Sequence, residues 1–366
     1  MHPEALVLDE STFNLGPAGR RELAGTGNSR TAPHGRRMES CSTAAGGHHI
    51  RLLACTIFEM NDVVVLHYPE VRRSNWELLC EAARKRGIRL TTWEPHRLQI
   101  YCTEAGIWCG YDGKQVRPAV ILHRTVAAFQ GLVLPALELW ASEGAVVLNE
   151  PGAAYHSRDK LLTSIALYRA QVPIVHTVAF FEPSQEALDP LASDDVVLKP
   201  AHGVRGEGVY ASRSTSELLA AWEGNRAPQY RTQQWSLPLV REHYLVQPLV
   251  KGGGRDLRAF VVDDACVALM QRQAAPGEIR ANLELGATST RLSLDHPAAR
   301  IAVAALEACH LDYGGVDLIE DEDGAIRVLE VDAWAGFVGI SATTGRDVAG
   351  AILQLAVTRG GRGTAT

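Results

Sequence analysis

The sequence lacks the cysteine pattern of a disulfide framework or of a cysteine-ligated zinc site. Its 7 cysteines are scattered along the chain, and none of them forms a CxxC pair. An odd number of isolated cysteines is typical of reduced thiols in the cytoplasm. We therefore expect a cytoplasmic protein that is not held together by disulfides.

The chain also lacks a long apolar run and a surplus of basic residues. Its richest apolar stretch, residues 125–141, is interrupted by Gln130, Pro135 and Glu138. A membrane-spanning helix needs about 18 or more consecutive apolar residues. The net charge of −6 does not favour binding to nucleic acid or to an anionic membrane. We therefore expect neither nucleic acid nor a membrane as a partner.

The first 49 residues lack hydrophobic periodicity and are rich in Gly, Ser, Thr and Arg. The early acidic residues Glu4, Asp9 and Glu10 argue against a signal peptide. We expect residues 1–49 to be disordered and the pair His48-His49, which has no partner at ligand spacing, to be inert. Met60 directly precedes a strand pattern, so we hypothesise that the natural start is Met60, which N-terminal sequencing of the native protein would test.

The whole chain, with 366 residues and 46% hydrophobic content, is long enough for one large core or for two or three domains. After Met60, strand and helix patterns alternate, which is typical of an α/β unit. Strands are predicted over 62–68, 88–93, 119–123 and 146–148, and helices over 75–86 and 129–143. These elements predict a small parallel-sheet domain over residues 60–150.

Farther along, Ser157 is the predicted N-cap of a helix that runs to Ala170, and residues 224–243 have little pattern. A hairpin is expected around Asp263-Asp264. The other predicted elements are strands over 174–181 and 244–247 and helices over 214–222, 297–309 and 348–357.

A glycine-rich loop follows a lysine at the end of an apolar strand, in the run Val197-Leu198-Lys199-Pro200-Ala201-His202-Gly203-Val204-Arg205-Gly206-Glu207-Gly208. Glycines let backbone amides approach a ligand, and a concavity of amides beside a lysine suits phosphate oxygens. The lysine precedes the glycines, which excludes the P-loop order. By itself the loop could also be a tight hairpin.

A second motif is an acidic hairpin near the C-terminus. Glu330 and Asp332 lie two apart on one predicted strand, so their side chains leave by the same face, and Asp317 on the partner strand can face them. Three oxygen ligands in an apolar sheet favour a hard cation, Mg²⁺ or Mn²⁺. The alternative, solvated edge charges, suits the turn residues 320–323 better than it suits Glu330 and Asp332.

The order of these motifs along the chain resembles that of a known family. Seven motifs follow one another along the chain: Arg-Asp-Lys, Lys-Pro with a glycine loop, Val-Gln before a hinge, Asp-x-Arg, Arg-x-Asn, Gly-Val-Asp and Glu-Val-Asp. This order is similar to that of the ATP-grasp superfamily, above all its RimK-like branch of glutamate ligases, which join a carboxylate to an amine with ATP. The resemblance covers residues 119–357.

The resemblance implies an α/β and α+β fold. This is the ATP-grasp fold, with an N-terminal α/β pre-ATP-grasp domain and two α+β lobes that enclose ATP. After the extension at 1–49, we expect the pre-ATP-grasp domain at 50–152, the central lobe with the glycine loop at 153–245, and the C-terminal lobe with the metal and phosphate site at 246–360. Relatives are often dimers or tetramers, so a homodimer or a homotetramer is possible and the oligomeric state is left open.

The resemblance also implies roles for single residues. Lys160 and Lys199 match the lysines that bind the α- and β-phosphates of ATP, although Lys160 alone could be an ordinary exposed lysine. Pro248 and Leu249 match the hinge that meets adenine, and Asp256 matches the ribose or hinge-proximal acid. The remaining ATP-binding matches are Gly203, Gly206, Gly208, Gln247, Arg280 and Asn282.

Three arginines match polar residues around the transferred phosphate and are the predicted catalytic residues: Arg258, Arg272 and Arg280. Any one of them could be a surface charge, but three at matching positions favour the functional interpretation. Asp317, Glu330 and Asp332 match the magnesium ligands, and the third of these is more commonly asparagine in the family.

The chain departs from the family pattern where the acceptor is expected. Leu285 replaces an arginine suited to an acceptor carboxylate, and the segment Ala333-Trp334-Ala335-Gly336-Phe337 replaces a Ser-Pro-Gly turn. These changes put glutamate in doubt as the added substrate. Glu284 is a candidate general base, and a solvated glutamate is the equally good alternative.

The expected reaction is ATP-dependent amide formation through an acyl phosphate, with ATP and Mg²⁺ or Mn²⁺ as cofactors and small-molecule carboxylate and amine substrates or a peptide acceptor as partners. Two alternatives are a small-molecule kinase on the same scaffold and a non-catalytic ATP-binding protein. Retention of both lysines and all three carboxylates argues against the last.

Overall fold

The computed structural model describes residues 56–57, 62–67, 73–124, 130–191, 195–202, 208–224 and 243–362. All of them belong to one compact unit, Leu52–Thr366. The predictions for residues 1–49, for Met60 and for 225–242 lie outside the described residues. None of the described helices is long and apolar enough to cross a membrane.

A parallel sheet with the strand order β3-β2-β7-β8 begins the described chain. Val63, Val64 and Val65 are fully buried, as expected for a central strand with both faces covered. This confirms the predicted strand–helix alternation. The elements are β2 (Asp62–Leu66), α1 (Arg73–Arg86), β3 (Arg89–Trp93), β7 (Val120–His123), α2 (Gln130–Ser142) and β8 (Val146–Leu148).

Residues between β3 and β7 form three strands of a second sheet, and Thr56–Ile57 adds a fourth. The sequence pattern predicted none of these strands. A turn at Asp112-Gly113, where both residues have positive φ, joins two of its strands in the manner of a tight hairpin. Trp93 and Trp140 pack beneath the sheet. Its elements are β1 (Thr56–Ile57), η1 (Pro95–Arg97), β4 (Leu98–Thr103), β5 (Gly106–Tyr111) and β6 (Lys114–Arg117), in the order β1-β6-β5-β4.

Two short helices follow, α3 (Pro151–His156) and α4 (Lys160–Arg169). The prediction that Ser157 caps the second helix is wrong. Asp159 is the N-cap, because its carboxylate accepts hydrogen bonds from the amides of the first turn of α4. Ser157 instead closes α3.

An antiparallel sheet of order β11-β10-β12-β9 comes next. Leu188, Leu198, Leu218 and Val246 form its small core. The strand predicted over 174–181 is shorter than expected, since only residues 178–180 join this sheet. The elements are β9 (Val178–Phe180), α5 (Gln185–Leu188), η3 (Asp189–Leu191), β10 (Val196–Pro200), β11 (Tyr210–Ser212), α6 (Thr215–Glu223) and β12 (Tyr244–Pro248).

The largest sheet has the order β15-β14-β13-β16-β17 and is antiparallel throughout. Both predicted hairpins are present in it, and the predicted C-terminal helix extends to Arg362. The elements are β13 (Arg255–Val262), β14 (Ala265–Gln273), η4 (Leu283–Leu285), β15 (Thr288–Arg291), α7 (Pro297–Ala308), β16 (Tyr313–Glu320), β17 (Ile326–Asp332), α8 (Val338–Thr344) and α9 (Val348–Arg362).

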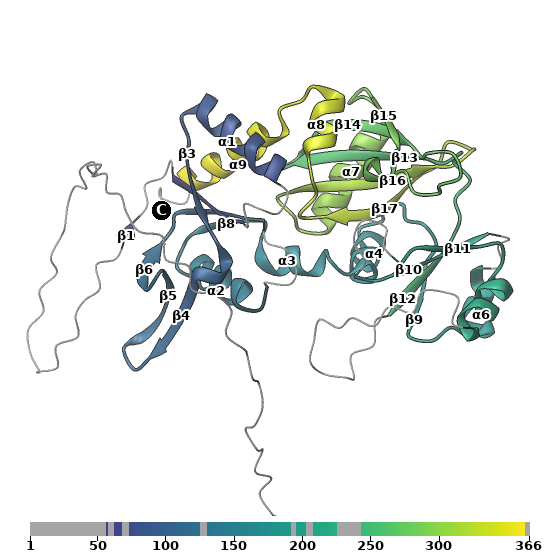
Figure 1. Ribbon diagram of the computed structural model, residues 1–366, viewed down its shortest axis with the longest axis horizontal. Helices are drawn as coiled ribbons and strands as arrows, with labels where there is room; N and C mark the ends of the chain where they lie inside the picture. The colour runs from purple at the N-terminus through teal and green to yellow at the C-terminus, as the bar shows by residue number, and fades with distance from the viewer. Residues whose placement is uncertain are drawn as a thin grey trace, which may run out of the picture. The chain divides into compact units, whose positions relative to one another are not determined.

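The two faces of this sheet are covered differently (Figure 1). Leu257, Ala259 and Val261 pack in one core with α7, whereas Phe260 and Val262 pack in another core with α8, α9 and the parallel sheet. Side chains alternate along a strand, so the even-numbered residues of β13 lie on the second face. Near the start of β13 the side chains on that face are charged instead of apolar.

Candidate functional site

The charged part of this sheet face is built by strand register. Arg258 pairs with Asp317 on β16, and Asp317 pairs with Glu330 on β17. Val331 pairs with Val316 and is fully buried in the core. Glu330 is opposite Asp317, and Asp332 is two residues farther along β17, so both lie on the same face as Asp317, as the sequence predicted.

Two guanidinium groups hold the Asp317 carboxylate. Arg258 Nε and Nη2 donate to it at 2.6 and 2.8 Å, and Arg272 Nη2 lies 3.2 Å from Oδ1. Burial disfavours the charge of Asp317, but the two arginines outweigh this effect and hold its pKa below the usual value. Asp317 is therefore a partly buried, ionised carboxylate.

Arg272 also donates to Asp256, at 2.7 and 2.6 Å. This places Asp256, the predicted ribose or hinge-proximal acid, in a partly buried ion pair with Arg272, which also contacts Asp317. Burial raises the pKa of Asp256 although Arg272 lowers it. The side chain of Arg272 is only 8% exposed, so it is a fixed bridge between two carboxylates.

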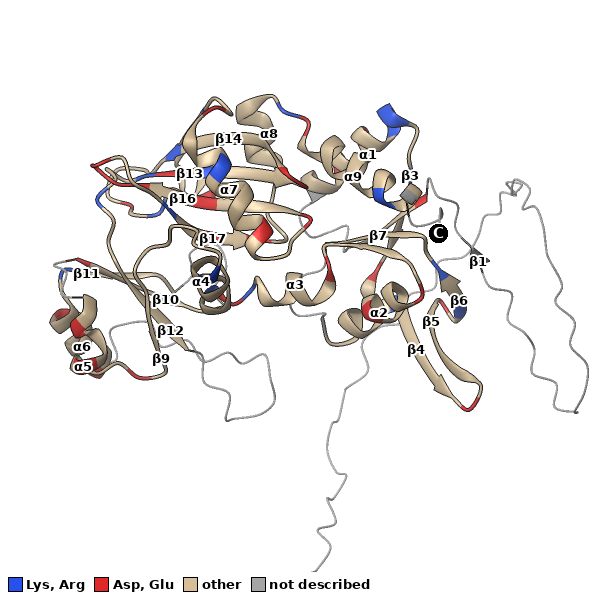
Figure 2. Ribbon diagram, turned by 180° about the vertical axis from the view of Figure 1, so that it is seen from behind, with Lys and Arg blue, Asp and Glu red and all other residues tan. Residues whose placement is uncertain are grey.

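The two predicted ATP lysines come from other elements, α4 and β10, and α4 lies beside β17 (Figure 2). Lys160, at the start of α4, places its Nζ 3.6 Å from Glu330 Oε1. Lys199 on β10 donates to Gln247 Oε1 at 2.7 Å, and Gln247 in turn donates to Thr177 at 2.9 Å. Burial lowers the pKa of Lys199 to about 8, against a partial opposing effect of Glu330.

The three predicted metal ligands share one face and offer only oxygen atoms, which suits Mg²⁺ or Mn²⁺. In this structure their side chains serve other partners. Asp317 binds arginines, Glu330 faces Lys160, and Asp332 Oδ1 accepts from the Trp334 amide at 2.9 Å. The donor set fits the ion in type and in face, although the structure does not gather the ligand oxygens of these three residues within 4.8 Å of one another.

The hinge and the glycine loop are described in part. The Leu249 amide, predicted to meet adenine, donates to the carbonyl of Asp195 at 2.8 Å, and Pro248 ends β12. Gly208 has a positive φ of 72°, which glycine adopts readily. Gly203 and Gly206 lie outside the described residues.

Arg280 and Asn282 occupy a separate segment. Arg280 pairs with Glu278 at 2.7 Å, and Asn282 caps η4 by accepting from the Glu284 amide at 3.0 Å. Leu285 at the end of η4 is 39% exposed. An open hollow of about 560 Å³ lies beside this segment, lined by residues that include Glu278 and Gly286.

The segment after Asp332 is held by hydrogen bonds from residues that the sequence patterns did not single out. Asn149 donates to the Ala333 carbonyl at 3.2 Å, and Arg124 donates to the carbonyls of Trp334 and Ala335 at 3.2 and 2.9 Å. Phe337 is fully buried, so it belongs to the core instead of lining an acceptor pocket. Each contact spans more than 180 residues of sequence, which no local motif reveals.

Comparison with known proteins identifies related chains. Residues 157–356 match the family model described as the RimK-like ATP-grasp domain. A protein from Xanthomonas oryzae pv. oryzae (strain MAFF 311018) named "Probable alpha-L-glutamate ligase" is 32% identical over 283 residues, which cover 75% of this chain and 90% of the relative.

Solved structures share the fold. The ATP-grasp ligase PsnB complexed with minimal precursor aligns with a TM-score of 0.61 at 22% identity, covering 82% of this chain and 99% of that one. D-cycloserine synthetase DcsG aligns with a TM-score of 0.58 at 18% identity, covering 82% and 99%. The architecture described above is thus that of these ligases.

Proposed function

Because the chain belongs to the RimK-like ATP-grasp family of ligases, we propose that it joins a carboxylate to an amine through an acyl phosphate, with release of ADP and phosphate. The product is an amide or peptide bond between an amino acid and a small molecule or peptide. We further propose that the ATP-grasp lobes are residues 153–245 and 246–360, and that the protein acts in the cytoplasm. The five cysteines that the structure describes form no disulfide.

One observation carries this proposal: cationic side chains from different elements converge on one carboxylate-bearing sheet face. Arg258 and Arg272 come from β13 and β14, and Lys160 comes from α4. Such an array can neutralise the charge of a polyphosphate and hold it in line with a nucleophile. When bound, Mg²⁺ or Mn²⁺ would supply charge neutralisation between the carboxylates and the phosphates, and Asp317, Glu330 and Asp332 are the residues that would hold it.

In the first step, a carboxylate oxygen of the substrate attacks the γ-phosphorus of ATP. A P–O bond forms, the bond to the β,γ-bridging oxygen breaks, and ADP leaves. Lys160 and Lys199 bind the phosphates and offset the charge that develops on ADP. Arg258 holds the transferring phosphoryl group.

In the second step, the amine nitrogen attacks the acyl carbon. A C–N bond forms, the C–O bond to the phosphate breaks, and the proton that the nitrogen loses ends on the released phosphate. Phosphate is a good leaving group where oxide is not, which is why the carboxylate must first be phosphorylated. Arg258 and Arg280 would hold the oxyanion of the tetrahedral intermediate.

The choice of substrate rests on the segment around η4. The relative in Xanthomonas oryzae is named for glutamate, and PsnB was solved with a precursor peptide. The apolar, partly exposed Leu285 cannot pair with an acceptor carboxylate. We therefore propose an added amino acid or a peptide acceptor whose side chain at this point carries no charge.

The proposal is tested by incubating the purified protein with Mg-ATP and hydroxylamine across a panel of amino acids, other carboxylates and carboxylate-bearing peptides. Hydroxylamine traps an acyl phosphate as a hydroxamate whatever the natural amine is. ADP and hydroxamate in equal amounts with one carboxylate would support the acyl-phosphate mechanism and name the substrate.

The matched pair of variants for this assay is Arg258→Ala and Arg291→Ala. Both residues lie on the same sheet, but Arg291 is exposed on β15. The first variant should lose hydroxamate formation and the second should keep it. ADP without hydroxamate in the wild-type protein would instead favour a kinase.

A further inference from the structure

A second cluster of metal-ligating side chains lies outside the phosphate site. The ligating atoms of Asp159, His202 and His243 all lie within 4.8 Å of one another. Among the residues that the structure describes, this is the one group of three or more histidine, cysteine or acidic side chains gathered so closely. It contains none of the residues assigned above to ATP or magnesium.

The two oxygens of Asp159 have separate partners. Oδ1 accepts from the amides of Leu161 and Leu162, at 2.8 and 3.2 Å. Oδ2 faces the Nε2 atoms of His243 and His202, at 3.4 and 3.6 Å. The capping bonds thus orient the carboxylate and leave one oxygen directed at both imidazoles, as outer hydrogen bonds do for metal ligands.

These distances suit a shared ion better than hydrogen bonds. An N–H···O bond joins atoms about 2.7–3.2 Å apart, which is shorter than both contacts. Nitrogen and oxygen ligands about 2.0–2.1 Å from a tetrahedral Zn²⁺ lie about 3.3–3.4 Å from each other. The observed separations are close to the edges of such a tetrahedron.

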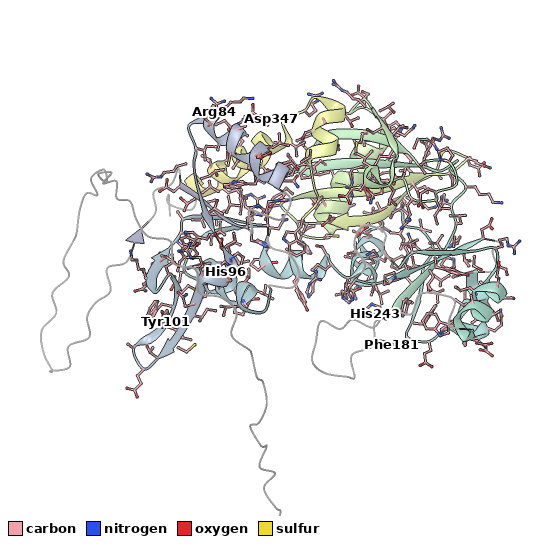
Figure 3. All side chains as sticks on the ribbon, viewed as in Figure 1. Arg84, His96, Tyr101, Phe181, His243 and Asp347 are labelled. Atoms are coloured by element: carbon pink, nitrogen blue, oxygen red, sulfur yellow. The ribbon has the colours of Figure 1, made fainter. Side chains whose placement is uncertain are left out.

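A second observation points to a ligand. His243 Nε2 is buried and makes no hydrogen bond within the described part of the chain. A buried polar atom without a partner costs about 1–3 kcal/mol, and a metal ion at this point would remove that cost. The ring of Phe181 lies 6.0 Å from that of His243 and meets it edge to face (Figure 3).

We propose that Asp159, His202 and His243 bind one divalent transition-metal ion of the Zn²⁺ class. Two imidazoles and one carboxylate are ligands for Zn²⁺ and its neighbours, whereas Mg²⁺ prefers oxygen ligands alone. Three protein ligands leave a fourth position for water. The His202 side chain is 37% exposed, which gives the ion a route from solvent.

The bound ion would hold together α4 and the residues that flank the glycine-rich segment and the start of β12. Asp159 begins α4, His202 is the last described residue before that segment, and His243 directly precedes β12. The backbone already joins these points, because the Ala201 amide donates to the His243 carbonyl at 3.0 Å and the Ala201 carbonyl accepts from the Lys160 amide at 3.2 Å. A metal ion would add a side-chain link to this junction.

The test is a calorimetric titration of the full chain, purified without a polyhistidine tag and stripped with a chelator, with ZnCl₂. We expect one tight site per chain that MgCl₂ does not fill. His243→Ala and Asp159→Asn should each weaken this site by on the order of 100-fold or more, since even outer partners of metal ligands are worth 10–100-fold. Exposed His176 is the control, and His176→Ala should bind as the wild type does.

Asp159→Asn keeps an oxygen that can cap α4, so it tests the site without unfolding the helix, which circular dichroism would verify. Co²⁺ bound to the wild type should also give visible absorption bands that His243→Ala lacks. Zinc binding that is equal in the wild type and in both ligand variants would overturn the proposal, because other histidines would then account for it. The proposal would also be overturned if Mg²⁺ at the same concentration as Zn²⁺ displaced Zn²⁺ from the site. No readout requires ATP, so failure here leaves the ligase proposal standing.

Discussion

Asp317 and Asp159 are both partly buried aspartates that face nitrogen-bearing side chains, but their surroundings differ. Asp317 is held by two arginines at 2.6, 2.8 and 3.2 Å. Asp159 presents one oxygen to two histidines at 3.4 and 3.6 Å. The first aspartate has hydrogen-bond contacts, and the second has contacts of the length that two ligands of one ion show.

The difference follows from the partners. A guanidinium is permanently charged and forks onto a carboxylate, so it completes a buried ion pair without a metal. A neutral imidazole offers a lone pair and is the commonest metal ligand in proteins. The same acidic residue type therefore belongs to the proposed phosphate site in one region and to a candidate transition-metal site in the other.

The largest expected effect comes from breaking the arginine network. Arg272→Ala would leave Asp256 and Asp317 buried with less compensation, and removing one partner of a buried pair typically costs about 3–5 kcal/mol. Urea denaturation should show a loss of this size in the free energy of unfolding. The exposed control Arg291→Ala should stay within about 0.5 kcal/mol of the wild type. A loss below about 1 kcal/mol for Arg272→Ala would show that the network is solvated.

Next comes the loss of a phosphate-binding cation. Lys199→Ala should reduce turnover by on the order of 100-fold or more, as removal of one donor to developing charge costs about 3 kcal/mol. The fold should persist, because the partner of Lys199 is the neutral Gln247. ADP release in the hydroxylamine assay measures turnover. Near-normal turnover in a folded variant would contradict the role of Lys199.

The histidine cluster predicts an effect that the arginine cluster cannot produce. Zn²⁺ at 100 times its dissociation constant should raise the unfolding free energy by about 2.7 kcal/mol if it binds only the folded chain. Thermal or urea denaturation with and without Zn²⁺ measures this difference. His243→Ala should abolish it, whereas Arg272→Ala should retain it. A stabilisation that survives in His243→Ala would locate the ion elsewhere.

The charge of Lys199 gives a smaller, pH-dependent effect. Its pKa of about 8 means that the unliganded protein carries the positive charge below pH 8 and loses it above. Bound phosphates favour the charged form, so affinity for a non-hydrolysable ATP analogue should fall by up to about tenfold per pH unit above pH 8. Calorimetric titration with the ATP analogue at pH 7, 8 and 9 measures this change in affinity. In Lys199→Arg the affinity should be flat over this range, and an equal decline there would assign the titration to another group.

The two clusters also differ in how far the sequence predicted them. Asp317 and Glu330 lie in motifs, and strand periodicity predicted the face that they share. Lys199 was singled out by the glycine-rich run that follows it. Asp159, His202 and His243 are separated from one another by more than 40 residues and meet only through the pairing of β10 with β12 and the position of α4. Spacing along the chain carries no signal for such a site.

The same limit applies to the fold. The buried strands β2 and β7 and the hairpin of β13 and β14 were predicted, because continuous apolar runs and turn residues mark them. Strands β4 and β5 were missed, since most of their residues are only half-buried or exposed and their alternation is weak. The cap of α4 was assigned to Ser157 because serine and aspartate are both good caps, and only the backbone geometry distinguishes them.

The smallest effect separates the two roles of Asp159. In a chelator, Asp159→Ala should lower the unfolding free energy by about 1 kcal/mol through loss of the α4 cap. Asp159→Asn should cost only a few tenths, because its side-chain oxygen can still accept from Leu161. With Zn²⁺ present, both variants should lack the metal-dependent stabilisation. Urea denaturation in the two conditions therefore resolves capping from ligation, and an Asp159→Asn variant that is still stabilised by Zn²⁺ would show that Oδ2 is not a ligand.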